Sequence, residues 1–162
     1  MLFHCNEEQR ERFLKPAVRG EIRFCFAQTE PDAGSDPARM RMRATRDGDA
    51  FILHGVKRFI TGAGEADYAQ VLAVTDAEQA ARGGITCFIV DLRSSGVILE
   101  RQWPTMMGDA PWEIRFEHVR VPAANVLGRV GGGLRPGTAV DPGRAHQGAQ
   151  GPLRGDCGAG PG

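Results

Sequence analysis

The 162-residue sequence lacks both an excess of charge and a long apolar run. Its 20 lysines and arginines balance 20 aspartates and glutamates, whereas binding to a nucleic-acid backbone needs a concentrated positive surface. No stretch of about 18 consecutive apolar residues is present, and the N-terminus has neither the basic nor the apolar region of a secretory leader. We therefore expect a cytoplasmic protein that binds neither nucleic acid nor a membrane.

Metal-binding and nucleophilic motifs are also missing. The four cysteines form no Cys-x-x-Cys pair and the four histidines have no ligand-like spacing, so we predict no metal site. Ser35 does not lie in a Gly-x-Ser-x-Gly sequence, the turn that exposes the nucleophilic serine of many hydrolases. The sequence therefore predicts no catalytic residue of these kinds in this chain.

Residues 131–162 contain very few apolar side chains. They hold 11 of the 22 glycines and four of the ten prolines, and no Ile, Phe, Met, Trp or Tyr. Such a segment buries too little apolar area to offset the entropy lost when its backbone is ordered. We predict that the folded region ends near residue 130 and that 131–162 is a disordered tail rich in Gly and Pro.

The first 130 residues show the patterns of one short helix and several strands. Asn6 and Gln9 fit a capping box, which predicts a short helix over about Glu7–Leu14, closed by Pro16 and Gly20. Asp47-Gly48 predicts a hairpin turn. Alternating polarity and apolar runs predict eight strand segments: Arg23–Ala27, Met40–Thr45, Phe51–His54, Tyr68–Thr75, Thr86–Asp91, Val97–Arg101, Trp112–Glu117 and Val119–Val121. Seven or eight short strands without a long helix predict a mainly β fold, either a sandwich or a small β-barrel.

Two segments combine a strand end with residues suited to a ligand. Gln28–Asp36 (QTEPDAGSD) follows an apolar strand with hydroxyls, carboxylates and Gly34, which permits close approach of a phosphate or a polar ring edge. In the second segment, Gly55–Gly64, strand alternation predicts that Phe59 and Thr61 share one face, as contact with a planar heterocycle requires. The alternatives are an ordinary polar turn for the first segment and core packing for the second.

Together these segments resemble the middle domain of the acyl-CoA dehydrogenase family. Gln28–Asp36 is similar to the family's first signature, and Gly48–Thr61 (GDAFILHGVKRFIT) is similar to its second. Gly84–Val90 (GITCFIV) and Phe116–Gly128 (FEHVRVPAANVLG) resemble the later core strand and the end of that domain. The resemblance implies a β-barrel over 21–130, a remnant of an N-terminal helical domain over 1–20 and, in 131–162, the start of a C-terminal domain.

The resemblance also implies a cofactor and its contacts. FAD would be the cofactor: Gln28 and Thr29 would line the flavin, and Phe59 would lie against its ring where relatives often carry Trp. Thr61 would bond near the flavin nitrogen that accepts hydride. Gly34 and Ser35 would meet the pyrophosphate, and Ser35 would lie near the acyl-CoA substrate.

What the resemblance implies about activity is limited by the domains that are missing. The family dehydrogenates acyl-CoA thioesters in fatty acid metabolism with a carboxylate base from the C-terminal helical domain, and passes electrons to an electron-transfer flavoprotein or a similar acceptor. That domain also builds the family's homo-oligomers. We therefore expect an inactive fragment of an oxidoreductase, with a reading-frame shift near Leu134 as one explanation for the tail. The alternatives are a non-catalytic barrel that binds flavin or acyl-CoA, and a non-functional gene fragment.

Overall fold

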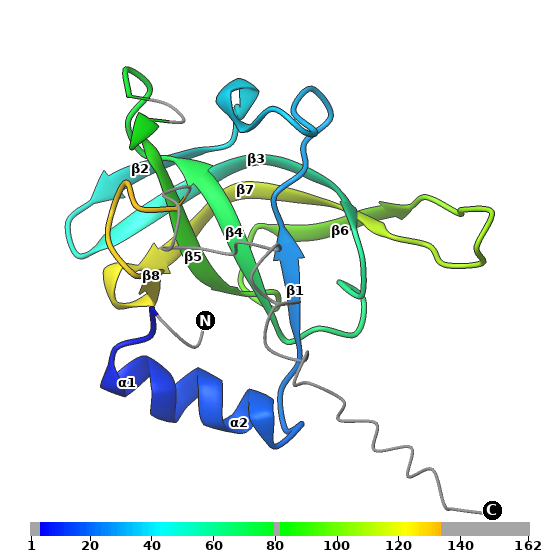
Figure 1. The fold of residues 1–162 in the computed structure, drawn as a ribbon, viewed down its shortest axis with the longest axis horizontal. Coiled ribbons are helices and arrows are strands. Elements are labelled where there is room, and N and C mark those ends of the chain that lie inside the picture. Colours follow the sequence, from blue (N-terminus) through cyan, green and yellow to red (C-terminus); the bar gives the residue numbers. More distant parts are fainter. Residues whose placement is uncertain (1–3, 80–81, 134–162) are drawn as a thin grey trace, which may run out of the picture.

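The computed structural model describes residues 4–79 and 82–133, in which a helical segment precedes an eight-stranded sheet (Figure 1). The strands are β1 (Phe24–Ala27), β2 (Arg43–Asp47), β3 (Ala50–Ile60), β4 (Tyr68–Val74), β5 (Ile85–Asp91), β6 (Val97–Gln102), β7 (Trp112–Pro122) and β8 (Val126–Leu127). Their order in the sheet is β6-β7-β3-β2-β4-β5-β8, and β1 pairs with β4 in parallel. The predicted mainly β fold with seven or eight strands is confirmed. The predicted tail lies outside the described residues from residue 134 onward.

The sheet curls around an apolar core to which strands β1 to β5 and β7 all contribute. Phe51 of β3 and Phe88 of β5 are not on hydrogen-bonded neighbours, yet their rings lie 5.1 Å apart, edge to face, inside this core. Both side chains are almost fully buried. The long strands β3 and β7 pair along most of their length and form one wall of the curled sheet (Figure 1).

The N-terminal helical segment packs on the outer face of β4 and β5. It comprises α1 (Glu7–Gln9), a π-helical turn over Arg10–Leu14 and α2 (Lys15–Val18). Phe13 is 1% exposed, with its ring 5.2 Å from that of Tyr68, because a second apolar cluster forms between this segment and the sheet. The Gln9 amide also donates to the carbonyls of Ala124 and Val126, at 2.8 Å each.

The capping box at Asn6 and Gln9 is present, but the predicted end of the helix at Leu14 is wrong, because the helical segment continues through Pro16. Pro16 cannot donate a backbone hydrogen bond, and its ring clashes with the carbonyl one turn earlier in a regular helix. The wider π turn that precedes Pro16 avoids this conflict, since the Lys15 amide donates to Arg10 five residues back. The helical segment therefore continues to Val18, and Gly20 follows it with a positive φ of 74°.

The hairpin between β2 and β3 is displaced by one residue from its predicted position. Asp47 pairs with Ala50, so the two loop residues are Gly48 and Asp49 and not Asp47 and Gly48. Gly48 has φ 58°, and a positive φ at the first loop position is typical of a type II′ turn. Strand β3 then runs beyond the predicted Phe51–His54 to Ile60.

The predicted strand over Met40–Thr45 is wrong in its first half. The structure has a 3₁₀ turn over Pro37–Arg39 and no strand until Arg43. Met40 and Met42 are buried, as the alternation predicts, but the backbone amides of Arg41 and Met42 donate to the Glu30 carboxylate instead of a neighbouring strand. A side chain thus replaces the ladder partner that the sequence pattern suggested.

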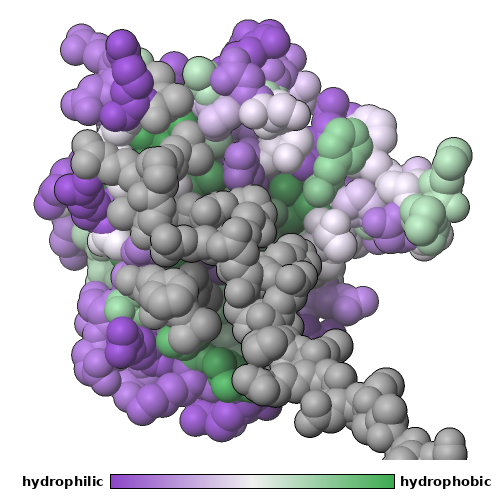
Figure 2. Space-filling model, viewed as in Figure 1, coloured by the Kyte–Doolittle hydropathy of each residue, from purple (hydrophilic) through white to green (hydrophobic). Residues whose placement is uncertain are grey.

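The β6–β7 hairpin projects from the rest of the sheet, at the right of Figure 1. Figure 2 shows that the end of this projection is apolar, whereas polar side chains predominate around the rest of the outline. Met106 and Met107 lie in this turn and are 102% and 90% exposed. Within the described residues, no helix is long and apolar enough to cross a membrane.

Candidate ligand-binding site

A pocket of about 480 Å³ opens where β1 and β3 end. Two stretches that are far apart in the sequence line it: Phe24, Cys25, Phe26, Gln28 and Thr29 from the first, and Phe59, Ile60 and Thr61 from the second. Phe26 and Phe59 are 36% and 52% exposed, so two large aromatic side chains remain accessible at the pocket. The pocket therefore offers aromatic surface, an amide and two hydroxyl groups within one space.

Four of the predicted site residues come together in this pocket, namely Gln28, Thr29, Phe59 and Thr61. Gly34 and Ser35 do not line it. They follow a tight turn in which Glu30 and Ala33 exchange backbone hydrogen bonds of 2.9 and 3.3 Å, and both are exposed. A Cβ added to Gly34 would meet no atom within 4 Å, so neighbouring protein atoms do not require glycine there.

The first wall of the pocket is held by β3. After Ala27, the segment Gln28–Glu30 leaves the ladder that pairs β1 with β4. The Arg58 amide donates to the Thr29 carbonyl at 2.8 Å, and the Lys57 ammonium donates to the Gln28 carbonyl at 2.9 Å. The residues just before Phe59 thus fix the backbone that carries Gln28 and Thr29.

Lys57 and Glu30 form a buried ion pair behind this wall. Lys57 is 0% exposed and its Nζ lies 2.9 Å from Glu30 Oε1. Burial lowers the pKa of Lys57 to about 8, because desolvation outweighs the attraction of the Glu30 carboxylate. Sequence reasoning missed this pair. The available signal was the two-residue spacing from Phe51 and Leu53, which places Lys57 on the inward face of β3.

Phe59 adopts a left-handed backbone conformation at the edge of the pocket. Its φ is 60°, which is rare for a large side chain and costs on the order of 1 kcal/mol. Strand alternation predicted that Phe59 and Thr61 face one way and Ile60 the other. Phe59 and Thr61 do share the pocket, but the positive φ interrupts the alternation, and the buried Ile60 also lines it.

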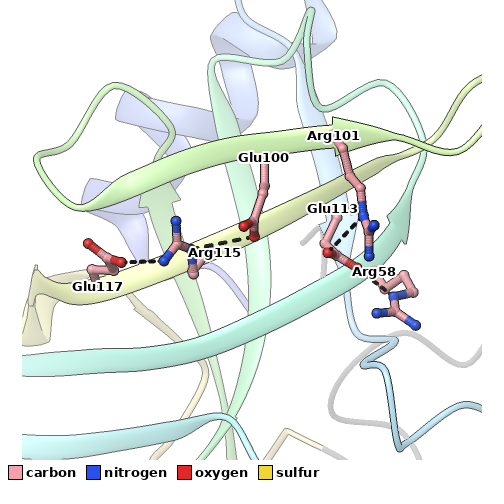
Figure 3. A network of polar contacts seen from close by, with 6 residues as sticks. All are labelled: Arg58, Glu100, Arg101, Glu113, Arg115 and Glu117. Carbon is pink, nitrogen blue, oxygen red and sulfur yellow. Dashed lines mark hydrogen bonds and ion pairs between the residues drawn. The ribbon is translucent and has the colours of Figure 1, made fainter.

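A cluster of aromatic rings and ion pairs supports the Phe59 ring. Trp103 meets Phe59 edge to face with 5.7 Å between ring centroids, and the guanidinium groups of Arg58 and Arg101 lie 5.0 and 4.1 Å from the Trp103 ring centre. The Glu113 carboxylate accepts from Arg58 Nε at 2.5 Å and from Arg101 Nε at 3.2 Å (Figure 3). Local sequence patterns do not reveal this cluster, because its members come from β3, β6, β7 and the loop between β6 and β7.

The chemistry of the pocket favours binding of a planar polar ring. Aromatic side chains can cover a ring face, and hydroxyl and amide groups can bond its polar edge. None of the described residues that line the pocket is acidic or a metal ligand of the usual kind apart from the buried Cys25. In the described part of the chain, no group of three or more His, Cys, Asp or Glu could hold a metal ion.

The fold and the pocket define a β domain with a pocket at one edge, where two strands end. Residues 25–119 match the family model described as "Acyl-CoA dehydrogenase, middle domain". The chain belongs to the acyl-CoA dehydrogenase family and carries its middle domain.

Similar proteins agree with this assignment. Over 136 residues the chain is 43% identical to "Caffeyl-CoA reductase-Etf complex subunit CarC" of Acetobacterium woodii, covering 83% of this chain and 36% of that protein. It is 39% identical to the mitochondrial isovaleryl-CoA dehydrogenase of Pongo abelii, covering 80% and 31%. The structure of butyryl-CoA dehydrogenase from Megasphaera elsdenii matches with a TM-score of 0.77 and 36% identity, over 81% and 35% of the two chains. The chain spans about a third of the length of these relatives.

Proposed function

We propose that this chain forms the flavin-facing wall of an FAD-dependent oxidoreductase that acts on acyl-CoA thioesters. The observation that carries the proposal is the meeting of Gln28, Thr29, Phe59 and Thr61 in one pocket, from two separate sequence motifs. Family membership supplies the reaction class, and names of similar proteins include both dehydrogenases and reductases of CoA thioesters. When bound, the flavin of FAD supplies a hydride acceptor or donor for such a reaction.

Each pocket residue has a role in this proposal. The Phe59 ring, supported by Trp103, covers part of the flavin face. The hydroxyl groups of Thr29 and Thr61 and the amide of Gln28 hydrogen-bond the polar edge of the ring system. Gly34 and Ser35, in the exposed loop beyond the pocket, contact the pyrophosphate, and Ser35 contacts the acyl-CoA.

We assign the general base of the reaction to none of the described residues. Glu30 is close to the pocket wall in sequence, but its carboxylate is 5% exposed and already accepts from the Lys57 ammonium and from the amides of Arg41 and Met42. Glu30 is thus a structural carboxylate, and the base comes from another part of the complete enzyme. An electron-transfer flavoprotein is the proposed electron acceptor of that enzyme, in line with the Etf complex named for one relative.

A fluorescence titration of the purified chain with FAD tests the proposal. We expect saturable but weak binding, because one wall alone cannot enclose the flavin. The double variant Thr29→Val/Thr61→Val removes two hydroxyl groups and keeps their size, so affinity should fall about tenfold or more, since each lost hydrogen bond costs about 1 kcal/mol.

Thr45→Val is the matched control, because Thr45 is an exposed threonine on β2 that does not line this pocket. The affinity of Thr45→Val for FAD should equal that of the unchanged chain. Absence of saturable FAD binding, or equal affinity in the double variant and the control, contradicts the proposal. We expect no turnover of acyl-CoA with a dye acceptor, since the described pocket contains no base.

A further inference from the structure

The Gln28–Glu30 wall of the pocket depends on bonds from outside its own strand. The pairing of β1 with β4 ends at Ala27, so the residues that follow have no strand ladder to hold them. Three contacts reach them from β3: the Arg58 amide to the Thr29 carbonyl, and the Lys57 ammonium to both the Gln28 carbonyl and the Glu30 carboxylate. Two of the three therefore come from a single side chain.

Lys57 lies behind the pocket and connects its two walls. It precedes Phe59 by two residues on β3, and its Nζ lies 2.9 Å from both the Gln28 carbonyl and Glu30 Oε1. The same carboxylate accepts from the amides of Arg41 and Met42 at 2.6 and 3.1 Å. Through this one ammonium group, β3, the Gln28–Glu30 segment and the chain leading into β2 are held together.

Stability alone does not explain a charge at this position. Buried ion pairs are often no more stabilising than apolar side chains of similar volume, since both charges lose their hydration. An apolar residue at position 57 would leave the Gln28 carbonyl without this donor, however, and the wall would lose two of its three contacts with β3. A lysine is long enough to reach a carbonyl and a carboxylate at once.

We propose that Lys57 is a positioning residue, which fixes the Gln28–Glu30 wall against β3 and so sets the arrangement of Gln28 and Thr29 relative to Phe59 and Thr61. For its effect on flavin binding, the inference rests on the proposed function. Its structural part stands independently, because the order of the wall can be measured without a ligand.

Amide hydrogen exchange, measured by NMR on the full chain, tests this role. The reporters are the amides of Glu30 and Arg58, which bond the carbonyls of Ala33 and Thr29. The variants compared are Glu30→Gln, which keeps the lysine, and Glu30→Gln/Lys57→Met, which replaces it without leaving a carboxylate charge buried. We expect both reporter amides to exchange at least tenfold faster in the double variant, relative to amides of β5 in the same sample.

Leu53→Ala controls for a general loss of stability, since Leu53 is fully buried on β3 and does not line the pocket. In this variant, the reporter and β5 amides should change together. If the double variant does not fold, Glu30→Gln/Lys57→Gln is measured in its place. The glutamine side chain at position 57 is too short to reach both the Gln28 carbonyl and residue 30. If the reporter amides of the double variant exchange as slowly as those of Glu30→Gln, the inference is wrong.

Titration with FAD then connects the wall to ligand binding. We expect affinity about tenfold weaker in the double variant than in Glu30→Gln, and unchanged in Leu53→Ala under conditions where that variant is folded. Equal affinity in Glu30→Gln and the double variant contradicts the link to the flavin. If the unchanged chain binds no FAD, the proposed function fails, while the exchange result still decides whether Lys57 positions the wall.

Discussion

Phe59 has a strained backbone conformation and also lines the pocket. Its positive φ turns a large aromatic side chain outward at the end of a strand, where half of its surface remains exposed. Trp103 and the ion pairs around Glu113 hold the ring in place. Strained residues persist where surrounding structure determines them, and they concentrate at functional sites. The strain at Phe59 thus supports the pocket as a ligand site independently of sequence motifs.

Replacement of Phe59 by glycine and by alanine measures this strain. Both changes remove the ring, but only alanine keeps the Cβ atom that makes the left-handed conformation unfavourable, at about 1 kcal/mol. Phe59→Gly should therefore be at least as stable as Phe59→Ala in urea unfolding. At Val56 on the same strand, where φ is not positive, glycine should be less stable than alanine by about 0.5–1 kcal/mol. If the glycine variant is less stable than the alanine variant at position 59 as well as at position 56, Phe59 is not strained.

The helical segment is the element whose stability depends most clearly on docking. Its two α-helical stretches, α1 and α2, are short, so helix formation alone gives the segment little stability. Phe13 supplies the main apolar contact, since its ring meets those of Phe24 and Tyr68 edge to face, and Gln9 supplies two hydrogen bonds. The segment and the sheet are therefore expected to unfold together.

Phe13→Ala tests this coupling. Removal of a buried phenylalanine ring should lower the free energy of unfolding by about 3 kcal/mol. It should also expose the bonds after Arg10 and Arg12 to trypsin under native conditions. Val18→Ala is the control, because Val18 is 78% exposed and its truncation should change stability by less than about 0.5 kcal/mol. A loss below 1 kcal/mol in Phe13→Ala would mean that the segment contributes little to the fold.

Elements set by local signals were predictable from the sequence, and those set by distant partners were not. Asn6 and Gln9 bond each other, so the start of the helix could be predicted from four residues. The first half of the predicted strand at Met40 is bonded instead to the Glu30 carboxylate, which no local pattern reveals. Likewise, Thr29 and Thr61 could be singled out from the sequence. The partners of Lys57 and the contact of Trp103 with Phe59 became visible only when the strands were brought together.

At the scale of the whole molecule, the proposed function makes the described chain one side of a larger site. The pocket is open and lacks a base among its described residues, and the chain spans about a third of its relatives. Buried ionisable groups nevertheless make global stability depend on pH, among them Lys57, Cys25 and Cys87. Their contributions have opposite signs.

Lys57 should make the folded state more stable as pH rises. Its pKa is about 8 in the folded protein and near its ordinary 10.5 when unfolded, so between these values the unfolded chain binds more protons. Its contribution to the free energy of unfolding therefore increases, by roughly 2 kcal/mol between pH 8 and 10. Burial raises the pKa of Cys25 to about 11 and that of Cys87 to about 12. Above pH 9 the unfolded chain loses these thiol protons first, so the cysteine contributions decrease.

Comparison with Glu30→Gln/Lys57→Met separates the two effects. The variant keeps all four cysteines and lacks the lysine, so subtracting its free energy of unfolding from that of the unchanged chain removes the thiol contributions. Urea unfolding at steps from pH 7 to 10 should show this difference shifting in favour of the unchanged chain, mainly above pH 8. A difference that stays constant would mean that Lys57 keeps an ordinary pKa and is hydrated in the folded state. A shift in the other direction would mean that attraction to Glu30 exceeds the cost of burying the ammonium group.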